Sequence, residues 1–162
     1  MVVSAVLLCL LAPRRAHAAN DCPWLNEATA SGVLGGVAVG SYTPTVNGKA
    51  AVCAFTIAGA DTRRTLQITV EAAATAPHMR LAAIETACEG KGAPLDAIGN
   101  EAIVCRARVH GQQRSEFVAG RVRDQVFTIT LTTIRKDDPV LTDNMLRMHI
   151  TVAAEQVSGN LF

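Results

Sequence analysis

The chain has 162 residues, of which 49% are hydrophobic and 4% are aromatic, and it carries 15 Lys and Arg residues against 14 Asp and Glu residues. This length is typical of one domain with a sizeable core. Because the formal net charge is only +1, the chain has no strong positive field of the kind that attracts nucleic acid or anionic membranes, and we expect no nucleic acid partner.

Residues 1–18 are expected to be a secretory signal peptide. Their apolar run, residues 2–12, is shorter than the roughly 20 residues that span a bilayer. Ala16 and Ala18 then form the small-x-small pattern of a signal-peptidase site, although no Lys or Arg precedes the apolar run. An uncleaved N-terminal anchor helix is the alternative.

Cleavage at this site predicts that residues 19–162 form a single domain, secreted or periplasmic, with no transmembrane segment. A bacterial lipobox carries a small residue directly before the modified cysteine. Because Asp21 precedes Cys22, soluble export is favoured, and membrane tethering through Cys22 is the alternative.

A short helix is expected over residues 23–34. Pro23 suits the first helical position, where its missing N–H costs nothing, and Gly35 can adopt the positive φ that ends a helix. Alternating apolar and polar residues then predict two strands, over residues 51–57 and 65–71, joined by a hairpin turn.

A second helix is expected over residues 75–88, followed by three antiparallel strands. These strands are expected at residues 101–109, 115–122 and 125–133. If Val122 opposes Gln125, then Gly120 faces Phe127, which pairs a small residue with a large one on the same face of the sheet.

The last helix is expected to begin with Asp138 as its cap and Pro139 as its first residue. Four apolar residues at helical steps define its expected core face: Leu141, Met145, Met148 and Val152. The predicted fold class is therefore α+β, an antiparallel sheet of about five to six strands covered by helices in the order α-ββ-α-βββ-α.

Four cysteines remain after the leader, and an even number in an exported chain predicts a disulfide framework. They are Cys22, Cys53, Cys88 and Cys105. Three pairings are possible, and we favour Cys22 with Cys53 and Cys88 with Cys105, because each bond then ties a helix to the following strand. A zinc site is not expected, since structural zinc sites use closely spaced cysteine pairs and here no two lie within ten positions of each other. No metal or cofactor is expected.

The chain contains the helix PWLNEATASGVLGG after an N-terminal cysteine, a Cys-x-Phe strand, and LDAIGNEAIVC before a strand hairpin. These motifs resemble those of small exported bacterial domains of unknown function. The element order is also similar to that of PsbP-like α+β folds. These resemblances imply a binding or accessory role in the bacterial envelope, and they bring no catalytic residues with them.

Four arginines lie near the predicted strand hairpin, and Arg114 lies near the turn that connects its strands. The four are Arg106, Arg108, Arg121 and Arg123. One interpretation is a basic patch for an acidic partner, either a protein or an anionic component of the envelope. The other is a solvated sheet face whose charges are balanced by nearby acidic residues.

No G-x-S-x-G, H-E-x-x-H or paired-carboxylate arrangement is found, and we expect no enzymatic activity. The leading hypothesis is an exported, non-catalytic binding or accessory domain of the bacterial envelope. The alternatives are a secreted, disulfide-stapled inhibitor or toxin-like interaction protein, and a cryptic hydrolase.

Overall fold

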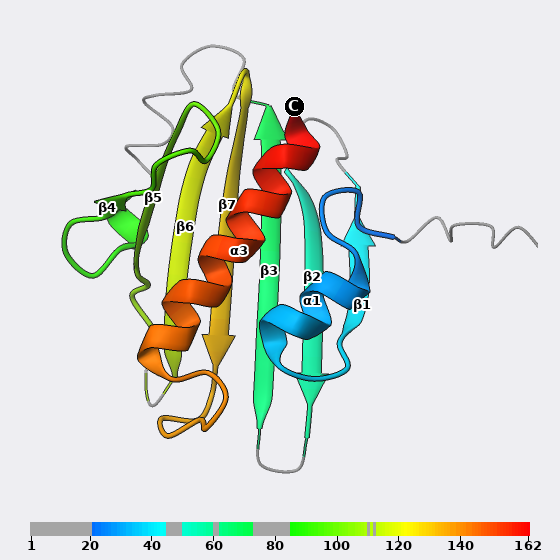
Figure 1. The fold of residues 1–162 in the computed structure, drawn as a ribbon, viewed down its shortest axis with the longest axis vertical. Helices are drawn as coiled ribbons and strands as arrows, with labels where there is room; N and C mark the ends of the chain where they lie inside the picture. Colours follow the sequence, from blue (N-terminus) through cyan, green and yellow to red (C-terminus); the bar gives the residue numbers. More distant parts are fainter. Residues whose placement is uncertain (1–20, 45–49, 60–61, 73–84, 110, 112) are drawn as a thin grey trace, which may run out of the picture.

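Seven strands form one antiparallel sheet in the structure, a computed structural model that describes residues 21–44, 50–59, 62–72, 85–109, 111 and 113–162 (Figure 1). The strands are β1 Val39–Thr43, β2 Ala51–Ala58, β3 Arg63–Ala72, β4 Ala93–Pro94, β5 Glu101–Arg106, β6 Arg114–Val122 and β7 Gln125–Thr133. Their order across the sheet is β1-β2-β3-β7-β6-β5-β4. The predicted α+β class is confirmed, but the sheet is larger than the five to six strands expected.

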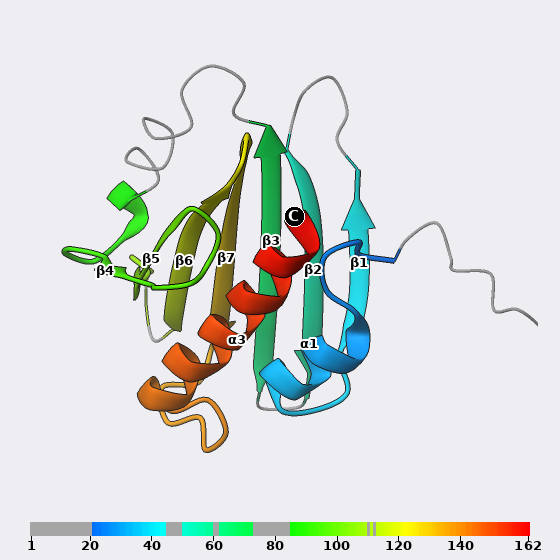
Figure 2. The ribbon, with the colours of Figure 1, turned by 45° about the horizontal axis from the view of Figure 1, so that its top comes forward.

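The two α-helices of the described residues, α1 Glu27–Leu34 and α3 Asp143–Leu161, lie on the same face of this sheet (Figures 1 and 2). The predicted order of helices differs from that of the structure. Most of the helix expected over residues 75–88 lies outside the described residues, and within the part that is described Glu85–Ala87 form a short 3-10 helix, η1. The main core fills the space between the two helices and the sheet.

The N-terminal helix ends where the sequence predicted but begins later. Asn26, not the residue before Pro23, is the cap, and its side chain accepts a hydrogen bond from the Thr29 N–H at 2.8 Å. Gly35 ends the helix with a φ of 70°, in the left-handed region that glycine adopts without strain. The expected start was wrong because proline is tolerated at the first position of a helix but also occurs outside helices, so Pro23 does not by itself mark a helix start.

The predicted start and core face of α3 are also wrong. The helix is capped by Thr142, and Met148 and Val152 are exposed, with relative accessibilities of 51% and 42%. The residues that it buries lie on a different side: Leu146, Ile150, Ala153, Ala154, Val157 and Ser158. Met145, Met148 and Val152 do share one face of the helix, but Leu141 lies before the helix begins, and the face that packs on the sheet is the neighbouring one.

The predicted register of the β6–β7 hairpin is confirmed. Val122 lies opposite Gln125, and Gly120 lies opposite Phe127. A Cβ atom at position 120 would overlap the Phe127 ring, which is fully buried. Glycine is therefore required here by the close approach of the ring.

Replacing Gly120 by Ala is expected to lower the free energy of unfolding by about 1–3 kcal/mol, the usual cost of overpacking a core. Urea denaturation measures it. The double variant Gly120→Ala/Phe127→Leu should recover part of the loss because it removes the overlapping ring. Gly32→Ala in α1 is the control, since no atom lies within 4 Å of a Cβ placed there. A Gly120→Ala variant as stable as this control would show that the ring moves freely.

The opposite face of the sheet, over β1, β2, β3 and β7, carries no charged side chain in three consecutive cross-strand rows. These twelve positions are Val39, Ser41, Thr43, Val52, Ala54, Thr56, Thr65, Gln67, Thr69, Thr128, Thr130 and Thr132. In an antiparallel sheet with one face on the core, the other face is commonly polar and in contact with water. Because these rows have no charged side chain, charged residues that could form a binding site lie around β5, β6 and the start of α3.

Both edges of the sheet are blunted. At β1, the Ala38 N–H donates to Ser31 Oγ at 3.0 Å and the Gly40 N–H donates to Glu27 Oε1 at 2.9 Å, so side chains of α1 occupy edge donors. At the other edge, β4 is only two residues long and ends in Pro94. Short strands, prolines and satisfied edge groups discourage pairing with another chain.

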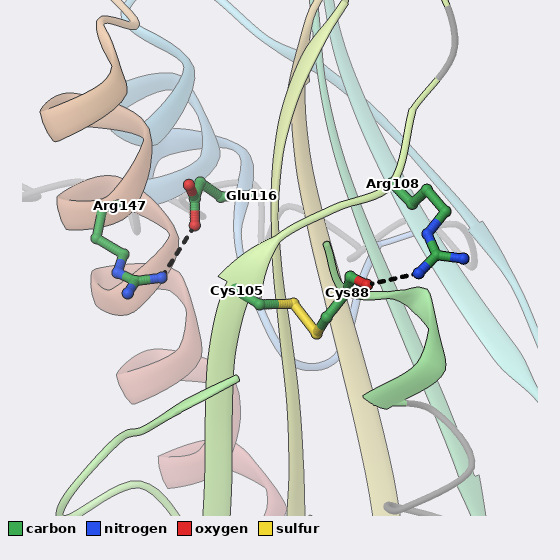
Figure 3. Close-up of a disulfide and its surroundings, with 5 residues drawn as sticks. All are labelled: Cys88, Cys105, Arg108, Glu116 and Arg147. Atoms are coloured by element: carbon green, nitrogen blue, oxygen red, sulfur yellow. Dashed lines mark hydrogen bonds and ion pairs between the residues drawn. A yellow bond between two sulfur atoms is a disulfide. The ribbon is translucent and has the colours of Figure 1, made fainter. Parts of the chain in front are cut away.

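The four cysteines within the described residues form two disulfides, with the pairing favoured from the sequence. Cys22 is bonded to Cys53, which is fully buried in the main core. Cys88 is bonded to Cys105 in a second apolar cluster that includes Phe117 (Figure 3). Cys105 pairs with Phe117 across β5 and β6, on the sheet face that does not carry the helices.

Candidate functional site

The structure does not bring the four predicted arginines together. Arg106 forms an ion pair with Asp143, the first residue of α3, whereas Arg123 lies over the ring of Phe162 at the end of the same helix, 5.7 Å from its centroid. Because an α-helix rises by about 1.5 Å per residue, α3 is roughly 28 Å long. Arg106 and Arg123 are therefore at opposite ends of the helix layer.

The other two predicted arginines make local contacts. Arg121 Nε donates to Glu101 Oε1 at 2.7 Å, across the β5–β6 pair. Arg108 Nη2 donates to the Cys88 carbonyl at 3.2 Å, beside the second disulfide (Figure 3). Of the four predicted arginines, only Arg106 belongs to the group of charges described next.

Arg106 and Arg114 converge on one carboxylate, that of Asp143. Arg114 Nη1 lies 2.8 Å from Asp143 Oδ1, and Arg106 Nη2 lies 3.1 Å from Asp143 Oδ2. Arg106 is the last residue of β5 and Arg114 is the first residue of β6, so neighbouring strands present both guanidinium groups at one end of the sheet. Each oxygen of the carboxylate is held by a different arginine.

These side chains surround an open pocket of about 510 Å³, which we call the arginine pocket. Its lining residues are Arg106, Gly111, Gln113, Arg114, Lys136, Asp137 and Asp143. Three cations and two acidic groups give the lining a formal charge of +1. The chemistry available here is the recognition of an anionic group by guanidinium and ammonium donors.

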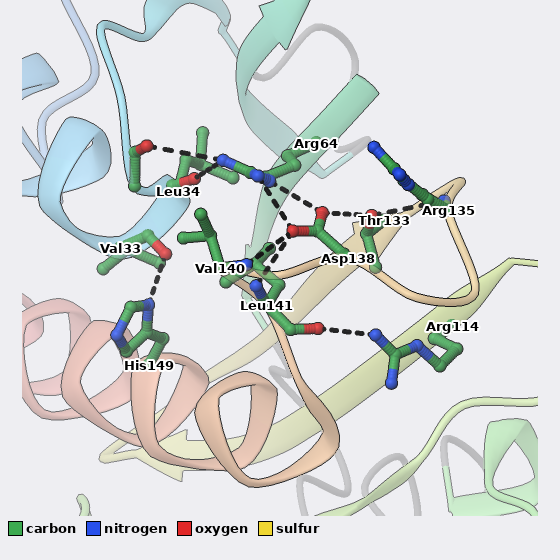
Figure 4. Close-up of polar contacts among 11 residues, drawn as sticks. Val33, Leu34, Arg64, Arg114, Thr133, Arg135, Asp138, Val140, Leu141 and His149 are labelled. Carbon is green, nitrogen blue, oxygen red and sulfur yellow. Dashed lines mark hydrogen bonds and ion pairs between the residues drawn. The ribbon is translucent and has the colours of Figure 1, made fainter. Parts of the chain in front are cut away.

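A buried carboxylate, Asp138, fixes the loop that brings Lys136 and Asp143 to the pocket. Its two oxygens accept hydrogen bonds from Arg64 Nε and Nη2, both at 2.8 Å (Figure 4). The Thr133 hydroxyl donates to it at 2.7 Å. These contacts connect β3, β7 and the loop before α3, and they set where the helix begins.

The same carboxylate and its arginine satisfy several backbone groups. The N–H groups of Val140 and Leu141 donate to Asp138 Oδ1 at 2.9 and 3.1 Å, and Arg64 Nη1 donates to the Leu34 carbonyl at 3.1 Å (Figure 4). Burial alone would raise the pKa of Asp138, but the hydrogen bonds from Arg64, Thr133 and the backbone hold it well below its usual range.

A second buried acid, Glu116, lies on β6 beneath α3. Its Oε2 accepts from Arg147 Nη1 at 3.2 Å (Figure 3), and its side chain is 7% exposed. Burial raises the pKa of Glu116, and the nearby charges of Arg147 and Arg106 only partly oppose this.

For Asp143 the charges of the arginines outweigh the effect of burial on its pKa. Burial raises the pKa of this more exposed carboxyl, but Arg106 and Arg114 outweigh that and lower it.

Sequence reasoning selected Arg106 but did not select Lys136, Asp137 or Asp143. These residues are about thirty positions further along the chain, and no local pattern connects them with Arg106. The signal that was available is the run Lys136, Asp137 and Asp138, a cluster of charges directly before the predicted last helix.

Within the described residues, no helix has the length and apolar character needed to cross a bilayer. In the same part of the chain, no three His, Cys, Asp or Glu side chains are grouped closely enough to hold a metal ion. The two disulfides fit an oxidising, extracellular environment. Compared with known proteins, the chain matches no family model and no curated protein sequence.

Proposed function

We propose that this protein is an exported, non-catalytic domain that binds an anionic partner of the bacterial envelope through the arginine pocket. The observation that carries the proposal is the convergence of Arg106 and Arg114 on the two oxygens of one carboxylate. Charge-assisted hydrogen bonds from guanidinium groups are among the strongest in proteins, and they suit carboxylate and phosphate groups.

The pocket is accessible to such a partner. The side chain of Arg106 is 50% exposed, so its guanidinium can reach a bound group without a change in the fold. The side chain of Arg114 is less exposed, at 21%. This partial burial strengthens its electrostatic interactions relative to those of a fully solvated charge. Its Nη1 and Nη2 groups make the contacts to Asp143 and to the Leu141 carbonyl, whereas its Nε is buried and faces away from a partner.

The alternative of a cryptic hydrolase receives no support from His149. Its Nδ1 lies 2.6 Å from the Val33 carbonyl, which joins α3 to α1 (Figure 4). A catalytic histidine is typically oriented by a carboxylate and points toward a nucleophile. His149 therefore supports helix packing, and the open, cation-lined pocket favours binding over catalysis.

Replacing both Arg106 and Arg114 by Ala is expected to weaken binding to poly-L-glutamate or inorganic polyphosphate about tenfold, which corresponds to about 1.4 kcal/mol. Binding of the wild-type protein should also fall as salt rises, because added ions shorten the range of exposed charges. Fluorescence anisotropy with labelled polymers measures both effects, and neutral dextran is the negative control.

The matched control is Arg121→Ala/Arg123→Ala, which removes the same charge from the other end of α3. This variant should keep its affinity within about twofold, since neither residue lines the pocket. A second test variant, Arg106→Gln/Lys136→Gln, leaves the Arg114 contact to the Leu141 carbonyl in place and so preserves the start of the helix. Equal losses in the control and test variants, or no salt-dependent binding by the wild type, would contradict the proposal.

A further inference from the structure

We infer that Asp143 is an internal competitor in the arginine pocket, whose carboxylate occupies the position that the anionic group of a partner takes on binding. The inference rests on the proposed function and adds to it how the pocket is regulated and which ligand group it accepts. That group is an oxyanion with two oxygens side by side, a carboxylate or a phosphate.

The contacts of Asp143 have the form of a bound ligand. Arg114 reaches one of its oxygens and Arg106 the other, at 2.8 and 3.1 Å, from two different strands. A carboxylate or phosphate on a partner offers the same pair of oxygens and can accept the same two hydrogen bonds. The arginines are therefore already arranged for an oxyanion, and the side chain of this protein satisfies them in the absence of a partner.

Asp143 can leave this position without loss of the fold. Its side chain is 52% exposed, and Thr142 is the N-cap residue of α3, accepting a hydrogen bond from the Met145 N–H. Asp138 provides the contrast, since its side chain is 0% exposed and it accepts bonds from several elements. Ion pairs as exposed as those of Asp143 typically contribute little to stability, so a partner anion can displace this carboxylate at small cost.

Displacement also changes the charge that a partner meets. With Asp137 and Asp143 in place, the lining carries a formal charge of +1, and removal of the Asp143 carboxylate leaves +2. The internal carboxylate therefore lowers the affinity of the pocket for anions and restricts binding to groups that can replace both of its hydrogen bonds. A polymer that presents many such groups has the advantage over a single small anion.

Replacing Asp143 by Asn tests the inference, because the amide keeps the shape of the side chain and removes its charge. We expect this variant to bind poly-L-glutamate and polyphosphate about five- to tenfold more tightly than the wild type at low salt. Asp137→Asn is the matched control, since it removes the same charge from the same pocket and leaves the contacts of Asp143 with both arginines intact. It should gain no more than about twofold.

The two polymers distinguish the source of the oxyanion, because a gain with only one of them assigns the pocket to carboxylates or to phosphates. If the wild type binds through Arg106 and Arg114 but Asp143→Asn gains nothing or binds more weakly, Asp143 positions the arginines and the inference is overturned while the proposed function stands. An equal gain in Asp137→Asn also overturns it, since the effect is then one of net charge alone. If neither the wild type nor Asp143→Asn binds either polymer, the proposed function itself is wrong.

Discussion

Replacement of Asp138 by Ala is expected to lower the free energy of unfolding by about 3–5 kcal/mol, the cost of leaving a buried charge without its partner. The side chain of Asp138 is 0% exposed and that of Arg64 is 9% exposed, so the guanidinium left behind cannot turn toward water without a change in the structure. The variant also loses the acceptor for Thr133 and for two backbone N–H groups. Urea denaturation followed by circular dichroism measures the difference.

Two comparisons separate this effect from a general loss of charge. The double variant Arg64→Met/Asp138→Leu should be more stable than Asp138→Ala, because it leaves no unpaired charge in the interior. Asp143→Asn, which breaks an exposed Asp–Arg contact, should change stability by no more than about 1 kcal/mol. A loss of that same small size in Asp138→Ala would mean that solvent reaches Arg64.

The stabilisation by Asp138 should depend on pH in a defined direction. Its pKa in the folded protein is lowered from the ordinary value of 3.8, so its contribution is fully present above that value and is lost as the pH falls below it. The difference in stability between the wild type and Asp138→Ala should therefore be constant near neutral pH and shrink in acid.

Removal of the first disulfide by Cys22→Ala/Cys53→Ala is expected to cost about 3–4 kcal/mol, and removal of the second by Cys88→Ala/Cys105→Ala about 3 kcal/mol. The difference follows from the sequence separations of 31 and 17, because a longer loop restricts the unfolded chain more. Alanine is preferable to serine, since Cys53 is fully buried and an unpaired hydroxyl there would add a cost of its own. Differential scanning calorimetry of both variants measures these losses.

Two outcomes would contradict this expectation. If either variant stays within about 1 kcal/mol of the wild type, the unfolded chain is already compact between the two cysteines. If the order is reversed, the packing of Phe117 and its neighbours around Cys88 and Cys105 contributes more than the closing of a longer loop.

The parts of the fold that could be predicted depend on neighbouring residues. The β6–β7 register follows from the pairing of Gly120 with Phe127, and the end of α1 follows from Gly35. The two strands not predicted have weak local patterns, because β1 is a short edge strand that includes Gly40 and β4 has only two residues, one of them Pro94.

The start of α3 could not be read from the sequence, for a physical reason. Asp138 followed by Pro139 has the composition of a helix start, and Asp138 does accept hydrogen bonds from two backbone N–H groups as a cap does. Its carboxylate is nevertheless held by Arg64, which is 74 residues earlier in the chain. That pairing holds the loop in a turn and delays the helix until Asp143.

The arginine pocket depends on the same long-range contact. Arg106 and Arg114 are close in the sequence, so a basic pair at one end of β5 and β6 could be predicted from the strands alone. Their common partner, Asp143, lies at the start of α3, directly after the loop that Asp138 holds in place. A sequence search for charged residues within the β5–β6 hairpin therefore finds the two arginines of the pocket but misses the residues that the loop and α3 contribute.

From Cys22 onward the cysteines are bonded in the order in which they occur along the chain, the first with the second and the third with the fourth. In the export that we propose, translocation with the N-terminus first would expose Cys22 and Cys53 to an oxidant before Cys88 and Cys105 emerge, so each cysteine would meet its native partner first. Disulfides that form in this order need no later reshuffling, which is slow and requires a free thiolate. Under this proposal an oxidase alone would be sufficient to form both bonds, whereas a crossed arrangement of the same four cysteines would require reshuffling by an isomerase.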